Sequence, residues 1–161
     1  MVKLLLIFSL FINTSRAFSE EPQHTEDVLH GVTLVSNYDA DTITPQIPGM
    51  DKAPLPMRKM LGKMRLRVDG IDTPEIRGGC PEEKALALEA KKFTAKFLEG
   101  KKFSIVKPTW GKYAGRFVGV PYVKGQSLAD ALVAAGYAVP YSGKTKRPNW
   151  CKILQNGKNV L

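Results

Sequence analysis

The segment MRLRVDGIDTPE, residues 64–75, joins an alternating pattern to a cluster of acidic side chains. In its first half, apolar side chains alternate with arginines, which predicts a strand with one face in the core. The core face comprises Met64, Leu66 and Val68. Arg65 and Arg67 are expected on the opposite face. The second half places three carboxylates within seven residues, a concentration of like charge that needs a compensating cation.

Short alternating runs on both sides of this segment predict further strands. Residues 30–47 give two strands around the polar turn NYDAD, and residues 101–106 and 116–123 give two more. The stretch between the last two strands, residues 107–115, reads as a turn, and the proline-rich residues 48–63 read as a loop. These patterns predict five strands.

The clearest helix is predicted for residues 81–100. Pro81 suits the first helical turn, Glu82 and Glu83 lie at the positive end of the helix dipole, and Gly100 can form the left-handed cap. The apolar face of this helix is expected to comprise Leu86, Ala90, Phe93 and Phe97.

A shorter helix is predicted to begin at Ser127, with Asp130 in capping-box position, and to stop at Gly136. The order of elements, with the long helix after the third strand and the short helix last, predicts a small α+β barrel. The length of 161 residues and the 43% hydrophobic content suit one domain.

The N-terminal residues 1–19 predict a secretory signal, with cleavage near residues 17–19. An apolar run of residues 4–12 follows Lys3 and is too short to span a bilayer comfortably; a lipid-held anchor is the alternative. Residues 20–30 would then form an N-terminal extension. We expect an exported, periplasmic or extracellular monomer without stable membrane association after signal cleavage.

The net charge of +9 and the pI near 9.6 suit a polyanionic partner, although many exported proteins are basic without binding one. Two cysteines, Cys80 and Cys151, would form a disulfide in an oxidising compartment; two separate buried thiols are the alternative. The segment of residues 138–145, AVPYSGKT, imitates a phosphate-binding loop but has Ala138 in place of the first glycine. It is expected to be an exposed loop.

Two loops carry the acidic side chains. Asp39 and Asp41 lie in the first turn, and the second loop contributes Asp72, Thr73 and Glu75. Oxygen ligands without histidine or cysteine favour a hard ion such as calcium. Together with Arg67 and Arg116, which can bind a phosphoryl group through paired donors, they suggest a site where a metal bridges the protein to a phosphate. The alternative is that each loop holds aspartate and threonine because they form turns well.

Three motifs carry a family resemblance: YDADT at residues 38–42, RVDGIDTPE at residues 67–75 and KYAGR at residues 112–116. In this order, they resemble the staphylococcal nuclease (thermonuclease) family, from Gly31 to about Tyr141. The resemblance implies a five-stranded OB-fold barrel that carries a calcium-dependent phosphodiesterase. Such an endonuclease cuts DNA and RNA and leaves 3′-phosphate ends.

The resemblance also implies roles for individual residues. The calcium ligands would be Asp41, Asp72 and the carbonyl of Thr73. The catalytic side chains would be Arg67, Glu75 and Arg116. The substrate-binding side chains would be Lys112, Tyr113 and Tyr141. The competing interpretation is a catalytically silent OB-fold module that grips single strands through those last three residues. Such a binder has no need of the acidic and arginine side chains together.

The sequence also departs from the family pattern. Ala40 stands where the family has glycine, so a glycine-only backbone there would be strained. The motif KYAGR is one residue longer than the prototype. The polar tail, residues 142–161, is expected to lack the third helix of the family and to dock through the disulfide rather than by burial of apolar surface.

Overall fold

The computed structural model describes residues 27–56, 59, 64–113 and 115–157. The predicted signal, residues 1–19, lies outside the described residues, as do residues 20–26 of the predicted extension. Within the predicted loop of residues 48–63, the described part contains a short 3₁₀ turn, η1 (Met50–Lys52). No helix within the described residues is long and apolar enough to cross a membrane.

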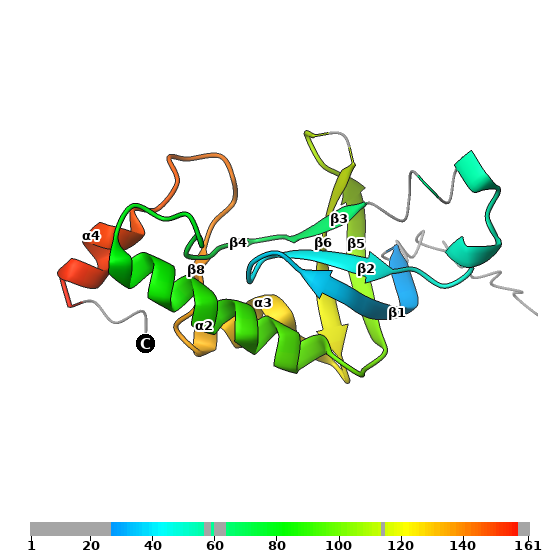
Figure 1. Cartoon of the computed structure of the whole chain (residues 1–161), viewed down its shortest axis with the longest axis horizontal. Coiled ribbons are helices and arrows are strands. Elements are labelled where there is room, and N and C mark those ends of the chain that lie inside the picture. Colours follow the sequence, from blue (N-terminus) through cyan, green and yellow to red (C-terminus); the bar gives the residue numbers. More distant parts are fainter. Residues whose placement is uncertain (1–26, 57–58, 60–63, 114, 158–161) are drawn as a thin grey trace, which may run out of the picture.

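Five strands close into a barrel, which confirms the predicted α+β OB fold (Figure 1). In chain order they are β1 (Val28–Asn37), β2 (Thr42–Gln46), β3 (Arg65–Val68), β5 (Phe103–Trp110) and β6 (Arg116–Val123). Neighbours pair antiparallel in the order β3-β2-β1-β5-β6, and the parallel pairing of β3 with β6 closes the barrel. This closure removes the unpaired edges that β3 and β6 would otherwise expose.

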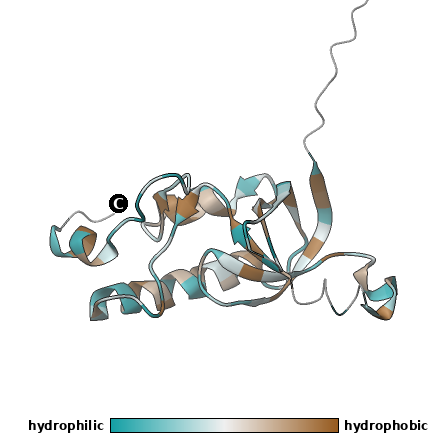
Figure 2. Cartoon of the chain, turned by 90° about the horizontal axis from the view of Figure 1, so that it is seen from above, coloured by the Kyte–Doolittle hydropathy of each residue, from teal (hydrophilic) through white to brown (hydrophobic). Residues whose placement is uncertain are grey.

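The strands place their apolar side chains inside the barrel, as the alternation predicts. Met64, Leu66 and Val68 are buried, whereas Arg65 is exposed and Arg67 is half-buried on the other face. Figure 2 shows hydrophobic residues concentrated along the strands, while α2 (Pro81–Leu98) mixes hydrophobic and hydrophilic positions. The parallel register sets Arg65 opposite Arg116, so β3 and β6 start at the same end of the barrel.

Strand β5 is longer than predicted. It continues to Trp110 through a bulge between Val106 and Thr109, where Lys107 has a φ of 52°. The bulge absorbs the local irregularity and lets pairing with β6 resume. The predicted turn over residues 107–115 is therefore wrong in its first half, and the hairpin connection begins at Gly111.

Helix α2 begins and ends near the predicted positions, and Gly100 takes the left-handed conformation with a φ of 69°. Its buried face, however, shares only Ala90 with the predicted one. The buried residues are Glu83, Ala87, Ala90, Thr94 and Leu98. Leu86, Phe93 and Phe97 are only partly buried along the edge of this face. The small side chains of Ala87 and Ala90 let the helix backbone approach the barrel, so Phe93 and Phe97 pack at the edge of the contact.

The second helix, α3 (Leu128–Ala134), is confirmed. The Ser127 hydroxyl oxygen accepts from the Asp130 amide at 3.2 Å, and Gly136 has a φ of 74°. The helix follows β7 (Gln126–Ser127), a short addition to β6.

The tail contains a third helix, α4 (Trp150–Gln155), which corrects the expectation that it lacks one. Asn149 caps this helix, because its side-chain oxygen accepts from the Lys152 amide at 3.0 Å. Trp150 is only 2% exposed, so the tail docks by burial as well as by covalent linkage. The predicted disulfide between Cys80 and Cys151 is present, with the Cα atoms 5.9 Å apart. Figure 1 shows α4 beside the first turns of α2.

Candidate active site

Most of the predicted site residues line one cleft of about 380 Å³ at the side of the barrel. The predicted residues among its lining are Arg67, Asp72, Glu75, Lys112, Tyr113, Arg116 and Tyr141. Asp41 and Thr73 do not line the cleft but contact side chains that do. The fold therefore brings together side chains from β3, the loop after β4 (Ile71–Asp72), the β5–β6 hairpin and the tail.

The turn between β1 and β2 holds a pair of crowded carboxylates. Asp41 is 2% exposed, and burial raises its pKa to about 7, although Arg67 lowers the pKa and Asp39 raises it. One carboxylate oxygen of Asp39, Oδ1, is buried and has no hydrogen-bond partner in the described part of the chain. This unpartnered oxygen leaves the turn with a carboxylate group that can take a further partner.

Hydrogen bonds to helix α2 hold the same turn in place, and the turn does not need a glycine at position 40. The Thr94 hydroxyl donates to the Ala40 carbonyl at 2.8 Å, and the side-chain amide nitrogen of Asn37 donates to the Lys91 carbonyl at 2.8 Å. Among the described residues other than glycine, only Lys107 and Lys124 have positive φ. Ala40 therefore fits without left-handed strain, and the expected cost of alanine at this position is absent.

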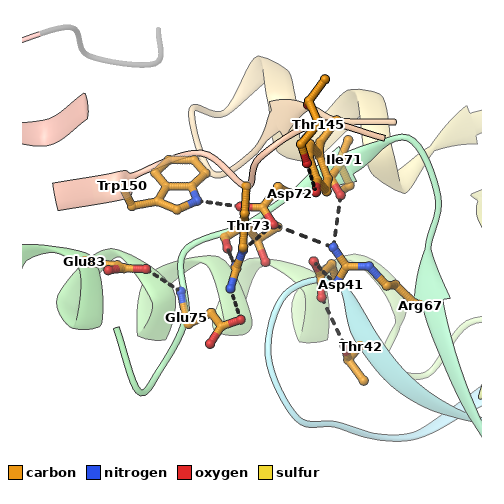
Figure 3. Close-up of polar contacts among 12 residues, drawn as sticks. Asp41, Thr42, Arg67, Ile71, Asp72, Thr73, Glu75, Glu83, Thr145 and Trp150 are labelled. Carbon is orange, nitrogen blue, oxygen red and sulfur yellow. Dashed lines mark hydrogen bonds and ion pairs between the residues drawn. The ribbon is translucent and has the colours of Figure 1, made fainter. Parts of the chain in front are cut away.

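Arg67 connects the two acidic loops (Figure 3). One guanidinium nitrogen, NH1, lies 2.8 Å from Asp41 Oδ2, and the other, NH2, lies 3.7 Å from Asp72 Oδ1. NH2 also donates to the Ile71 carbonyl at 3.4 Å. Its outward position on β3 makes this reach possible, because the adjacent positions 66 and 68 point into the core.

Asp72 is the most completely enclosed acid of the site, at 1% exposed. The antiparallel pairing of β4 with β8 (Val139–Pro140) sets it opposite Val139 and brings the following tail over it. Its Oδ2 accepts from the indole nitrogen of Trp150 at 2.8 Å, and its Oδ1 accepts from Nε of Arg147 at 2.7 Å. Both oxygens therefore have partners from the tail.

The loop bearing Glu75 is held by the start of α2. Glu83, which is buried in the first turn, accepts from the Glu75 amide at 3.3 Å and from the Gly79 amide at 2.9 Å. The Glu75 side chain itself remains 50% exposed toward the cleft. Its backbone is fixed while its carboxylate stays accessible to water, as a general base requires.

Arg147 is the functional candidate that the sequence did not reveal. Its guanidinium donates to Asp72 Oδ1, to the Thr73 carbonyl at 2.9 Å and to Glu75 Oε1. Burial lowers the pKa of Arg147, but the hydrogen bonds and charges of Asp72 and Glu75 outweigh burial and leave the pKa above its ordinary value. Arg147 follows the segment that imitates a phosphate-binding loop, and its basic character was the only available signal.

Arg116 begins β6 and lies with its guanidinium carbon 5.7 Å from the centre of the Tyr113 ring, which is 70% exposed. The Arg116 amide donates to the Tyr113 carbonyl at 3.2 Å, and its carbonyl accepts from the Gly111 amide at 3.0 Å. These bonds accommodate the longer motif in a tight connection, and Arg116 still faces the cleft. Its guanidinium has no ion pair with a described carboxylate, so it is available to an anion.

The donor set near Arg67 fits calcium. Asp41 and Asp72 provide buried carboxylates and Thr73 provides a main-chain carbonyl, all of them oxygen ligands of the kind that calcium prefers. The buried Oδ1 of Asp39, in the same turn as Asp41, has no hydrogen-bond partner among the described residues and so is an unsatisfied acceptor close to this set. A second cluster, Cys80, Glu83 and Cys151, does not compete for metal because its sulfurs are joined in the disulfide.

The family model for staphylococcal nuclease homologues matches residues 65–158. The chain belongs to the staphylococcal nuclease family. The matched part of the staphylococcal nuclease domain begins at β3, after the YDADT turn, and extends through α4, beyond the predicted limit near Tyr141. No curated protein matches the chain.

The contact of Trp150 with the site leads to a stability prediction. Replacing Trp150 with phenylalanine should lower the free energy of unfolding by about 1–3 kcal/mol, because the buried Asp72 loses a donor. Urea denaturation followed by circular dichroism measures this change. Trp110→Phe is the matched control, since Trp110 is 77% exposed and its replacement should change stability by less than about 0.5 kcal/mol. Equal unfolding curves for the two variants would contradict the prediction.

Proposed function

We propose that the protein is a calcium-dependent endonuclease that hydrolyses phosphodiester bonds in DNA and RNA and leaves 3′-phosphate ends. The observation that carries this proposal is the single cleft in which Arg67, Glu75 and Arg116 lie together. Two guanidiniums and a half-exposed carboxylate suit a phosphodiester, because arginine binds anionic oxygens and a carboxylate can orient water. Membership of the staphylococcal nuclease family supports the same reaction.

Asp41, Asp72 and the Thr73 carbonyl would hold the calcium ion. When bound, calcium would polarise a non-bridging phosphate oxygen and neutralise charge that develops at phosphorus. The Thr42 hydroxyl donates to Asp41 Oδ1 at 3.0 Å and so orients that carboxylate. Asp39 would act on Asp41 through their mutual repulsion, which favours a neighbouring cation.

The protein's own side chains would carry the remaining steps. Glu75 would hold the attacking water and accept its proton. Arg67 and Arg116 would bind the phosphate from two sides and stabilise the charge that grows on its oxygens in the transition state. Arg116 would lie near the leaving 5′-oxygen. The two arginines come from neighbouring barrel strands, so their separation is set by the paired backbones of β3 and β6.

Three further residues would position the nucleic acid. Tyr113, with its exposed ring beside Arg116, would stack on a base, and Lys112 would contact the phosphate backbone. The Tyr141 hydroxyl already donates to the Thr145 carbonyl at 2.9 Å, so this residue would offer its ring. These contacts do not read sequence and are compatible with both DNA and RNA.

A catalytically silent module that binds single strands is the second candidate, and exposed Trp110 and Tyr113 favour it. It does not account for Glu75, whose backbone is fixed by Glu83 while its carboxylate faces the cleft. Binding of single-stranded DNA without cleavage, at any calcium concentration, would favour this second function.

Cleavage is expected to require calcium. Incubation of the purified protein with plasmid and single-stranded DNA should give cleavage with calcium and none with excess chelator. Magnesium should substitute poorly, because it demands a tighter octahedron than two loop carboxylates and a carbonyl provide. Glu75→Gln, assayed in parallel, identifies activity from contaminating nucleases. Full cleavage in excess chelator would refute the calcium requirement.

We also propose that the protein is exported, to the periplasm or the extracellular medium, and acts there as a monomer. The Cys80–Cys151 disulfide supports this location, because such bonds persist in oxidising compartments. The predicted signal of residues 1–19 would be removed, leaving no stable membrane association.

A further inference from the structure

We propose that Arg147 is an internal cation that competes with calcium for the acidic site and thereby sets the calcium concentration at which the site fills. This inference rests on the calcium site proposed above. It concerns a residue of the tail, outside the three motifs that define that site.

The contacts of Arg147 coincide with the groups that calcium would use. Its Nε lies 2.7 Å from Asp72 Oδ1, and one terminal nitrogen, NH2, lies 2.9 Å from the Thr73 carbonyl oxygen. The other terminal nitrogen, NH1, pairs with Glu75, the proposed general base. One guanidinium thus binds two of the three proposed calcium ligands and the proposed base.

Arg147 and calcium cannot share these oxygens at low cost. Asp72 is 1% exposed, and in so poorly hydrated a place two cations bound to the same oxygens repel strongly. Arg67 already lies 3.7 Å from Asp72 Oδ1, so the site carries one guanidinium even without Arg147. Arginine does not lose its proton at accessible pH, and calcium must therefore displace Arg147 rather than neutralise it.

The tail keeps Arg147 at high local concentration. On one side, the Tyr141 amide donates to the Gly70 carbonyl at 2.9 Å. On the other side, Trp150 binds Asp72, and Cys151 is bonded to Cys80. A group tethered at both ends competes as an intramolecular ligand, and the Arg147 side chain, 39% exposed, can still swing into the adjoining cleft.

The expected change in calcium affinity follows from the fraction of time that Arg147 occupies the acidic site. If the guanidinium occupies the acids about nine-tenths of the time without metal, the apparent calcium affinity is weakened roughly tenfold. Removal of Arg147 should restore the intrinsic affinity. Truncation of an ordinary supporting residue would have the opposite effect, because a less ordered Asp72 binds calcium less well.

Isothermal titration calorimetry with calcium chloride on the full chain tests this proposal. Arg147→Ala should lower the calcium Kd about tenfold relative to Lys146→Ala, a control that removes the same charge from an exposed neighbouring position. Arg147→Lys should fall between, because an ammonium keeps the charge but cannot bridge three oxygens as the planar fork does. Circular dichroism confirms that each variant is folded.

Nuclear magnetic resonance gives a second readout that does not depend on activity. The side-chain Nε–H signal of Arg147, identified by its loss in Arg147→Lys, should be protected from solvent exchange without calcium and lose protection on titration. The indole N–H signal of Trp150 should shift in the same titration, and a Trp110→Phe background leaves it as the single indole signal.

The outcomes separate this proposal from the proposed function. Equal calcium affinities in Arg147→Ala and Lys146→Ala, or weaker affinity in Arg147→Ala, would overturn the competition and leave the nuclease proposal standing. Retained protection of the Arg147 Nε–H at saturating calcium would also overturn it. Absence of calcium binding in all variants would overturn both the competition and the calcium site.

Discussion

Replacing Arg67 with lysine is expected to lower the rate of DNA cleavage by roughly a hundredfold or more while the protein stays folded. The lysine keeps the positive charge but cannot span Asp41 and Asp72 as the guanidinium does, nor present paired donors to a phosphate. The decisive measurement is kcat under saturating calcium with plasmid substrate. Arg116→Lys should cause a loss of the same order.

Arg65→Lys is the matched control. Arg65 lies on the same face of β3, two residues before Arg67, but its guanidinium carbon lies 5.7 Å from the centre of the Tyr38 ring rather than in the cleft. Its replacement should leave the cleavage rate within about twofold, because only surface charge geometry changes. Wild-type rates in Arg67→Lys or Arg116→Lys would remove that arginine from the site.

Removing the disulfide is expected to have the largest effect on stability. The bridge closes a loop with a sequence separation of 71 residues, and the chain-entropy model assigns such a loop a contribution of roughly 3–5 kcal/mol. The double variant Cys80→Ala with Cys151→Ala should lose that amount of unfolding free energy in urea denaturation. The cleavage activity should also fall, as a smaller effect than the loss of stability, because the bridge holds the tail over Asp72.

Reductant provides the control for the disulfide experiment. It should destabilise the wild-type protein to about the level of the double variant and leave the double variant itself unchanged. Equal stability of the oxidised wild-type protein and the double variant would refute the expected contribution of the disulfide to the free energy of unfolding. Labelling of both cysteines by alkylation of the unfolded, unreduced protein would show that no bridge forms in solution.

Local patterns were sufficient for most of the elements. Alternation along residues 64–68 predicts the strand that carries Arg67, since side chains of a strand point to opposite faces by geometry alone. Capping signals predict the bounds of α2 and α3, because the unpaired groups at helix ends need partners nearby in the chain. The site motifs were equally local, and the cleft contains most of their side chains.

Local patterns gave wrong predictions where tertiary packing determined which residues of an element are buried or how far a strand extends. Of the predicted face of α2, only Ala90 is fully buried; Ala87 is buried beside it, and Phe93 and Phe97 pack partly buried at the edge. The close approach of the helix backbone to the barrel determines which face is buried, and the periodicity of apolar residues along the helix does not reveal that approach. Similarly, β5 passes through a bulge at Lys107 because the ladder with β6 compensates for the local irregularity.

The sequence by itself therefore determined the barrel class, the approximate bounds of α2 and α3 and the identity of the acidic and arginine motifs, but not the helix α4 in the tail. Only the tertiary structure decided what surrounds Asp72. Trp150 and Arg147 reach it across more than 70 residues of sequence, through the pairing of β4 with β8 and the Cys80–Cys151 bond. Such contacts depend on where two distant segments meet in space, and neither segment carries a local period or motif that encodes the meeting.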